Sequence, residues 1–271
     1  MPLLERSTRS VEITDAGRAF YEDARATLSQ VEHMLDRARA IGAGRAGSLA
    51  LGYSPLVRQT ASRLIRGFCA EYPGVDVVHN MAYSEALAAA VDRGEIDGAL
   101  IIAGAVELPL RGEPVRVLPW LCVVNRSHPL AGAASIPVCA LESHPVAIVD
   151  LPFWRRYIES ELSVHGVSAE LVGVWDPIAR FPTEVLEDGS SCVWLQTSEY
   201  CESTGVEIEF DPPFTCEVEL VWRPDAKSAA LDRFVEHMRA LREKERWPCP
   251  EHAEEKRWPR HEHAQKHRPG G

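Results

Sequence analysis

The sequence predicts an α/β protein that begins with a long N-terminal helix, and three observations support this fold class. Residues 14–44 show a helical pattern that no proline interrupts. Residues 48–102 alternate short apolar runs with helical patterns in the order strand, helix, strand, helix, strand. Residues 146–195 repeat this alternation less regularly. Such an order is typical of a parallel sheet with right-handed crossover connections.

The helix predicted over residues 14–44 has defined ends and a heptad pattern. Thr14 can cap its first turn, and Gly42-Ala43-Gly44 supplies a stop. Apolar or small residues recur at alternating spacings of four and three, namely Phe20, Ala24, Thr27, Val31, Met34, Ala38 and Ile41. This spacing favours a dimerisation helix. Its main contacts should be Phe20, Ala24, Val31, Met34 and Ala38. The alternative is a solvated helix that covers its own domain.

The first subdomain is predicted from the clearest alternation of strands and helices. Strands are expected at residues 48–53, 75–78 and 97–102. The first helix should begin at Ser54-Pro55, a capping residue followed by proline, and end at Tyr72-Pro73-Gly74. Ser84 should cap the second helix, which stops at Gly94.

The second subdomain has a weaker pattern, and the chain then returns to the first. Strands are expected at residues 118–124, 146–149, 171–174 and 192–195, and helices at residues 152–166 and 177–188. A strand at 215–222 and a helix at 228–241 should complete the first subdomain. The tail from Glu243 is low in aliphatic residues and rich in charge, so it should be disordered.

Several segments occur in the order found in a known family. Leu4-Glu5-Arg6 is followed by Arg9-Ser10-Val11-Glu12-Ile13-Thr14-Asp15-Ala16-Gly17 and then directly by the long helix. Phe68-Cys69-Ala70-Glu71-Tyr72-Pro73-Gly74-Val75, Asp92-Arg93-Gly94-Glu95-Ile96-Asp97 and His128-Pro129-Leu130-Ala131 come later. In this order the sequence resembles the LysR-type transcriptional regulators over almost its whole length.

The resemblance implies a fold like that of type 2 periplasmic binding proteins, with two α/β subdomains joined by crossing strands around a cleft. The implied segments are a remnant wing of a winged helix-turn-helix at 1–13, a linker and dimerisation helix at 14–44, subdomain I of the effector domain at 48–120 and 215–242, subdomain II at 121–214, and a disordered tail at 243–271. The implied partners are a small-molecule effector, DNA and a second subunit, in a homodimer or homotetramer.

One departure from the family concerns DNA. The family carries a helix-turn-helix before the wing, whereas this sequence begins at Met1-Pro2. The expected DNA contacts are therefore Arg6 and Arg9 alone. Residues 48–241 hold 14 Lys or Arg and 27 Asp or Glu, a net charge of −13, which should repel DNA. DNA binding by the chain as given is expected to be weak or absent.

Composition excludes several other classes of protein. No apolar run reaches the length of a signal peptide or a membrane span, so a cytoplasmic protein without a membrane partner is expected. The seven cysteines form no CxxC pair, which favours reduced thiols. No P-loop, nucleophile elbow or dinucleotide-binding motif occurs, so neither an enzyme nor a cofactor is predicted. His261, His263 and His267 could bind a metal, but a solvated tail is the preferred interpretation, and no metal site is predicted.

The candidate effector site follows from the fold class, because open α/β sheets bind ligands at the carboxyl ends of their strands. The residues at such ends are Tyr53, Ser54, Ile102, Ala103, Gly104, Phe153, Trp154, Gln196 and Thr197. Ser54 lies at a helix start, where a carboxylate could bind. The alternatives are that Ser54 is a plain N-cap and that Phe153 and Trp154 belong to the core.

The leading hypothesis is the effector-sensing and dimerisation part of a LysR-type regulator that binds a small anionic or aromatic ligand between its subdomains. The alternative is a solute-binding protein of the same fold without a DNA role. That alternative predicts an export signal and no heptad helix, and the sequence shows the opposite of both.

Overall fold

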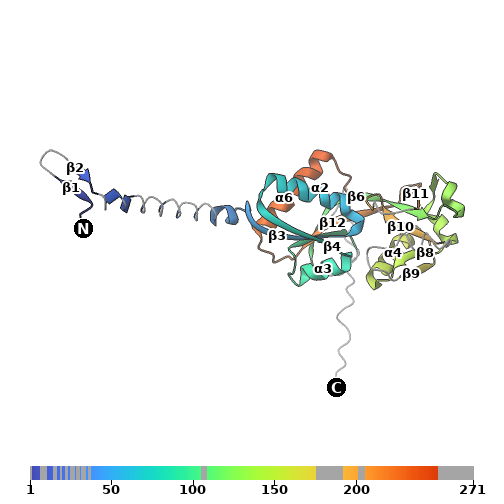
Figure 1. Ribbon diagram of the computed structural model, residues 1–271. Coiled ribbons are helices and arrows are strands. Elements are labelled where there is room, and N and C mark those ends of the chain that lie inside the picture. The colour runs from blue at the N-terminus through green and yellow to red at the C-terminus, as the bar shows by residue number, and fades with distance from the viewer. Residues whose placement is uncertain are drawn as a thin grey trace, which may run out of the picture.

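The structure is a computed structural model that describes most of the effector body and parts of the N-terminal segment. The described residues are 2–6, 11–14, 17, 18, 20, 21, 24, 28, 31, 35, 38–104, 109–174, 192–200 and 205–249. Figure 1 shows the N-terminal hairpin standing apart from an α/β body in which two lobes lie side by side. None of the helices in the described part of the chain is long and apolar enough to cross a bilayer.

The N-terminal segment is a hairpin followed by helix. Strands β1 (Leu4–Arg6) and β2 (Val11–Ile13) pair antiparallel, with Arg6 opposite Val11. Thr14 caps the helix as predicted, because its Oγ1 accepts the backbone N–H of Gly17 at 3.0 Å. The described residues from 17 to 42 are helical, and Gly44 follows with a φ of 67°, the left-handed conformation that commonly ends a helix.

Subdomain I is built around a parallel core of three strands. Strand β3 (Ala46–Tyr53) lies between β4 (Gly74–Met81) and β5 (Gly98–Ile102) and is parallel to both. The short 3-10 helix η1 (Pro55–Val57) follows β3, and helix α2 (Arg58–Glu71) continues from it. Helices α2 and α6 (Ala229–Glu245) contact each other on one face of the sheet, while α3 (Ser84–Asp92) covers the opposite face (Figure 1).

Two antiparallel strands cross between the lobes. Strand β6 (Arg111–Val124) pairs with β12 (Thr215–Trp222) as far as Pro119, and from Trp120 onward it pairs with β10 (Val193–Thr197). The sheet continues from β10 to β8 (Val146–Val149) and β9 (Leu171–Val174), in the order β4-β3-β5-β12-β6-β10-β8-β9, so one hydrogen-bonded sheet runs through both subdomains. Strand β6 therefore belongs to both lobes.

Subdomain II packs helix α4 (Pro152–Val164) against a parallel group of strands. Strand β8 (Val146–Val149) lies between β10 and β9 (Leu171–Val174) and is parallel to both. Two 3-10 helices and two strands also belong to the described part of this lobe, namely η2 (Pro129–Gly132), η3 (Val138–Ser143), β7 (Ser135–Ile136) and β11 (Val206–Phe210). Strand β11 pairs with β6 and β7 and was not predicted.

Two predicted caps are wrong in detail. Ser54 lies at the N-cap position of η1 but makes no capping hydrogen bond with its side chain, because the 3-10 turn that follows closes through the backbone instead, where Val57 donates to the Ser54 carbonyl at 3.0 Å. Ser84 is the first helical residue of α3, and Tyr83 is the N-cap. The expected end of the last helix and start of the tail are also too early. Helix α6 runs to Glu245, and Trp247 beyond it is only 9% exposed.

The predicted helix over 177–188 and the tail from residue 250 lie outside the described residues. The ends of several predicted strands shift, and β4, for example, continues to Met81 instead of ending at residue 78. Strand β6 starts at Arg111 rather than at 118, because its first half is held by β12, and β10 extends to Thr197 because β6 pairs with it that far. A short sequence window does not contain these long-range hydrogen bonds.

Candidate functional site

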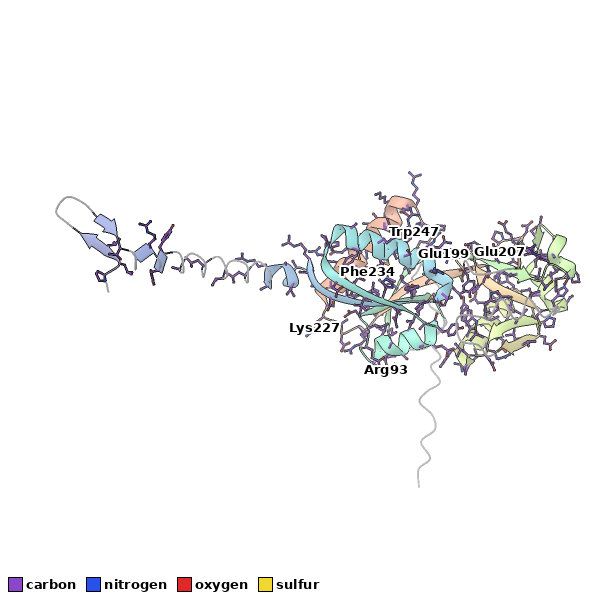
Figure 2. The ribbon with its side chains drawn as sticks, in the orientation of Figure 1. Arg93, Glu199, Glu207, Lys227, Phe234 and Trp247 are labelled. Atoms are coloured by element: carbon purple, nitrogen blue, oxygen red, sulfur yellow. The ribbon has the colours of Figure 1, made fainter. Side chains whose placement is uncertain are left out.

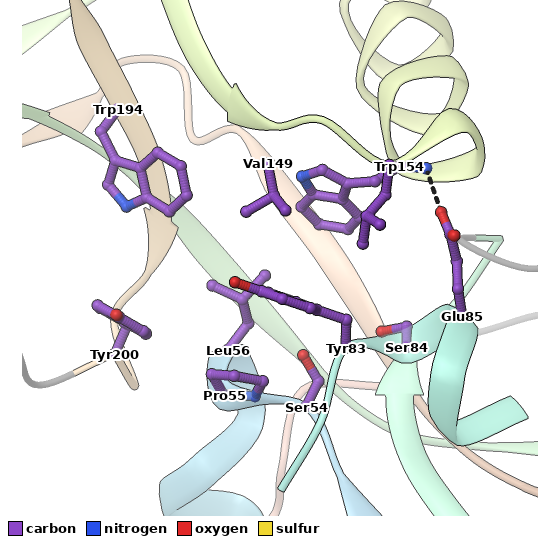
Figure 3. A pocket seen from close by; sticks show the side chains of 11 residues that line it. Ser54, Pro55, Leu56, Tyr83, Ser84, Glu85, Val149, Trp154, Trp194 and Tyr200 are labelled. Atoms are coloured by element: carbon purple, nitrogen blue, oxygen red, sulfur yellow. Dashed lines mark hydrogen bonds between the residues drawn. The ribbon is translucent and has the colours of Figure 1, made fainter. Parts of the chain in front are cut away.

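A cleft opens where the two lobes meet, and it takes its walls from both (Figure 3). The space between its walls is about 620 Å³, a volume that includes open solvent at the mouth. Subdomain I contributes Ser54, Pro55, Leu56, Tyr83, Ser84 and Glu85, and subdomain II contributes Val149, Leu151, Trp154, Trp194 and Tyr200. Most of these residues follow the carboxyl ends of the parallel strands β3, β4, β8 and β10, where the fold class places ligands.

One carboxylate bridges the cleft. The Oε1 atom of Glu85, in the first turn of α3, accepts the backbone N–H of Trp154 at 2.9 Å (Figure 3). Trp154 lies in the first turn of α4, where backbone N–H groups lack partners within the helix. Glu85 thus caps a helix of the other subdomain and places a negative charge at the positive end of its dipole.

A second carboxylate makes the reverse connection. Glu199 follows β10 and is 4% exposed, and Figure 2 labels it where the two lobes meet. It accepts the backbone N–H of Thr60 at 2.8 Å and the Thr60 hydroxyl at 2.6 Å, near the start of α2. Its third partner is Arg116 of β6, whose Nη1 lies 3.1 Å away. Each lobe therefore supplies a carboxylate to a helix N-terminus of the other.

Aromatic rings form much of the remaining wall. Trp154 stacks on Tyr157 with ring centroids 5.3 Å apart, and Trp120 packs behind it at 6.2 Å. Burial raises the pKa of Tyr157 well above its usual range, so its hydroxyl remains neutral. Figure 3 shows Tyr83 lying across the opening, between Val149 and Trp154 on one side and Leu56 and Ser54 on the other.

Of the predicted effector residues, the structure places Ser54 and Trp154 in the cleft lining, one from each subdomain. The other seven do not line this cleft. Tyr53 contacts the ring of His79 at 5.8 Å, and Phe153 lies against the Arg156 guanidinium at 4.4 Å. Gln196 and Thr197 are buried in the sheet, where the Gln196 amide donates to Glu207 at 2.9 Å and the Thr197 hydroxyl donates to the Leu56 carbonyl.

The residues at the carboxyl end of β5 pack against neighbouring elements and do not line the cleft. Ile102 is fully buried, and the N–H of Ala103 donates to the Glu217 carbonyl at 2.8 Å. Gly104 has a φ of 77°, and a Cβ atom there would lie 3.6 Å from the Tyr157 ring. This corner therefore closes the first subdomain against the second.

Sequence reasoning missed the residues after β4. Tyr83, Ser84 and Glu85 contribute three neighbouring side chains to the cleft. The rule about strand ends selects them only once β4 is known to end at Met81, because the strand expected at 75–78 points to His79 and Asn80 instead. Leu151 and Tyr200 follow β8 and β10 in the same way.

The expected DNA and dimer residues are described only in part. The backbone of Arg6 pairs within the hairpin, and Arg9 and Met34 lie outside the described residues. Phe20 is 60% exposed, and Val31 is 41% exposed. Ala24 is half-buried and Ala38 is exposed on the same helix.

Metal-binding groups of three or more His, Cys, Asp or Glu residues do not occur in the described part of the chain. The histidines of the predicted tail motif lie beyond that part. Two cysteines on the crossing strands are deeply buried. Burial raises the pKa of Cys122 to about 12 and that of Cys216 well above its usual range, so both remain thiols.

The fold and the position of the cleft define a ligand-binding protein with two α/β subdomains, preceded by a helix and a hairpin. The profile of the LysR substrate binding domain matches residues 42–242. The chain is 30% identical over 248 residues to the uncharacterised HTH-type transcriptional regulator YnfL of Escherichia coli (strain K12), covering 77% of this chain and 81% of that protein. The chain belongs to the LysR family of transcriptional regulators.

Other relatives agree with this assignment. The HTH-type transcriptional regulator PunR of Escherichia coli (strain K12) is 23% identical over 263 residues, covering 88% of this chain and 78% of that protein. The crystal structure of CbnR, a LysR family transcriptional regulator, superposes with a TM-score of 0.70 at 20% identity, covering 87% of this chain and 84% of that one. This structural likeness shows that the two proteins share a fold.

Proposed function

We propose that this chain senses a small-molecule effector in the cleft between its subdomains and passes the signal to a dimer through the N-terminal helix. The observation that carries the proposal is the composition of the cleft, whose walls come from both lobes. A ligand held between two lobes binds one of their relative arrangements better than another, and so shifts the population toward it.

The route from the cleft toward the N-terminus is short. Ser54 in the cleft directly follows strand β3, and the other end of β3 follows the end of the helix at Gly44. The guanidinium of Arg233 in α6 donates to the carbonyl of Ala43 at 3.1 Å, which fixes the helix end to the body. A movement at the cleft therefore has a packed path to the helix.

The experiment for this proposal is a thermal-shift screen of a metabolite panel against the 271-residue chain, with a variant that fills the cleft. A ligand of the folded state raises the melting temperature by mass action. Val149→Trp should abolish the shift because it adds a ring to the cleft wall, whereas Val78→Trp, at a 62% exposed position on β4, should leave it intact. A stabilising ligand that is unaffected by Val149→Trp would place the effector elsewhere.

DNA contact by this polypeptide is proposed to be weak and independent of sequence. The hairpin region carries Arg6 and Arg9 against Glu5 and Glu12, and residues 48–241, with 14 Lys or Arg against 27 Asp or Glu, have a net charge of −13. A mobility-shift assay of the 271-residue chain at low and moderate salt tests this. Nanomolar binding that resists competitor DNA would contradict it. A cytoplasmic location and a homodimer or homotetramer belong to the same proposal.

A solute-binding role without DNA is the second candidate. Its support is the fold alone, because the relatives described above are named as transcriptional regulators.

A further inference from the structure

The described part of the cleft lining contains an acidic residue and no basic one. Among the lining residues that the structure describes, Glu85 is the one carboxylic acid, and no lysine, arginine or histidine occurs. The surrounding body, with 14 Lys or Arg and 27 Asp or Glu in residues 48–241, adds a net charge of −13. An anion entering this cleft would meet repulsion both at long range and at contact.

The helix N-termini near the cleft, which could otherwise attract an anion, already face carboxylates. The first turn of α4 receives Glu85 through the Trp154 N–H at 2.9 Å. The first turn of α2 receives Glu199 through the Thr60 N–H at 2.8 Å. The first turn of α3 contains Glu85 itself. A carboxylate ligand would therefore have to displace a carboxylate of the chain or lie beside it.

The same geometry suits a hydrogen-bond donor. Oε1 of Glu85 is used by Trp154, whereas Oε2 makes no hydrogen bond to the residues that the structure describes. The rest of the described lining is largely apolar or aromatic. Figure 3 shows the Trp154 backbone N–H beside Glu85, with Leu56 and Val149 farther away in the cleft. The face of an aromatic ring can stack on another flat ring, and it also attracts cations.

We propose that the cleft takes an aromatic molecule bearing a protonated amine or another N–H donor, not an aromatic acid, and that Glu85 selects it by accepting that donor. This inference rests on the proposed function, because it names the chemical class of the effector in the same cleft. The ring would lie among the aromatic and aliphatic side chains, and the donor would reach the free oxygen of Glu85.

The test is isothermal titration calorimetry of the full chain with ligands that differ only in their polar end. One series is 2-phenylethylamine, 2-phenylethanol and 3-phenylpropionate, and the other is tryptamine, indole-3-ethanol and indole-3-propionate. We expect the amine of at least one series to bind at least tenfold more tightly than the matching acid. The alcohol should fall between them.

The decisive variant is Glu85→Gln. Glutamine keeps an oxygen that can accept the Trp154 N–H, so the cap on α4 is retained while the charge is lost. We expect the amine affinity to fall about tenfold, as for the loss of a charged hydrogen bond, and the acid to gain. The matched control is Glu95→Gln, which removes an exposed carboxylate paired with Arg93 and should leave both affinities unchanged.

The outcomes separate the two proposals. An acid that binds best, or a preference that survives Glu85→Gln, overturns the charge assignment alone, provided that Val149→Trp still abolishes binding. Binding that persists in Val149→Trp, or no binding by any of the six ligands, counts against both the cleft as the effector site and the ligand class.

Discussion

Glu199 is a carboxylate that accepts hydrogen bonds from Thr60 and Arg116 in the first half of the chain. Because Thr60 and Arg116 satisfy it in a buried position, its removal leaves a cation and a helix N-terminus without their partner. We expect Glu199→Ala to lower the free energy of unfolding by about 3 kcal/mol in urea denaturation. Glu95→Ala, at an exposed ion pair, is the control and should have little effect. Equal effects of the two changes would mean that Glu199 does not join the lobes.

Glu219 on β12 gives a test that depends on pH. Burial raises its pKa, with a further contribution from Glu217. A carboxyl group with a raised folded-state pKa favours folding below its unfolded pKa, and this contribution is lost as the pH rises through the folded pKa. Glu219→Gln should therefore have a higher melting temperature than the wild type at pH 7. The difference should disappear below about pH 4, where the wild-type carboxyl is protonated in both states.

For single residues, the sequence predicted which side chains lie at strand ends better than it predicted their hydrogen-bond partners. The rule about strand ends found Ser54 and Trp154, because the carboxyl ends of parallel strands meet at one edge of a sheet. It also selected Gln196 and Thr197, which the structure buries in pairing with β6. The bond from Glu85 to Trp154 joins residues 69 positions apart, and no local pattern contains it.

The helix before β3 presents a row of large exposed apolar residues that the predicted heptad did not include. Leu28 is 66% exposed and Leu35 is 51% exposed, and Tyr21 continues the same spacing of seven at 60%. This row lies beside Ala24, Val31 and Ala38, which the prediction did include. Together they form a heptad with larger side chains than the one through Thr27.

In sedimentation equilibrium we expect the wild-type chain to be a dimer and the combination of Leu28→Lys with Leu35→Lys to be a monomer. Each buried charge should cost about 3 kcal/mol, or roughly a hundredfold in the dissociation constant. Phe20→Lys combined with Thr27→Lys changes the row predicted from the sequence and should weaken association less. The reverse order of effects would favour the predicted row, and a monomeric wild type would exclude both.

The segment after α6 is part of the fold, although its composition suggested otherwise. Trp247 packs against the Arg116 guanidinium at 5.0 Å, and the Pro248 carbonyl accepts the N–H of Val117 at 2.6 Å. Figure 2 labels Trp247 close to α6. A charged composition predicted disorder because it contains few aliphatic residues, but one tryptophan and one carbonyl suffice to bind this segment to β6.

Trp247→Ala should therefore lower the free energy of unfolding by about 3 kcal/mol, as expected when a large buried ring is lost. Lys244→Ala, at an exposed position one turn earlier, should change it little. Denaturation in urea, followed by circular dichroism, measures both. If the two variants unfold together, the contact with β6 carries no stability.

At the scale of the whole molecule, the strand order shows that a shared strand joins the two lobes. Strand β6 carries hydrogen bonds to β12 in one lobe and to β10 in the other, so the lobes share a continuous sheet at that point. Elsewhere the contacts across the cleft include the two carboxylate caps, which are polar and local. The alternation of strands and helices predicted both lobes, whereas the shared strand depends on pairing between distant segments.

The position of β3 has a consequence for how sensing is measured. Its eight residues join the end of the N-terminal helix to Ser54 in the cleft, a span of about 26 Å. If an effector alters the geometry of paired helices, then thermodynamic reciprocity requires that anything fixing that geometry alters the affinity for the effector by the same factor. A partner protein or a cross-link that fixes one spacing of the two helices would therefore change the effector affinity of the cleft. The same chain would then respond at different effector concentrations in different assemblies.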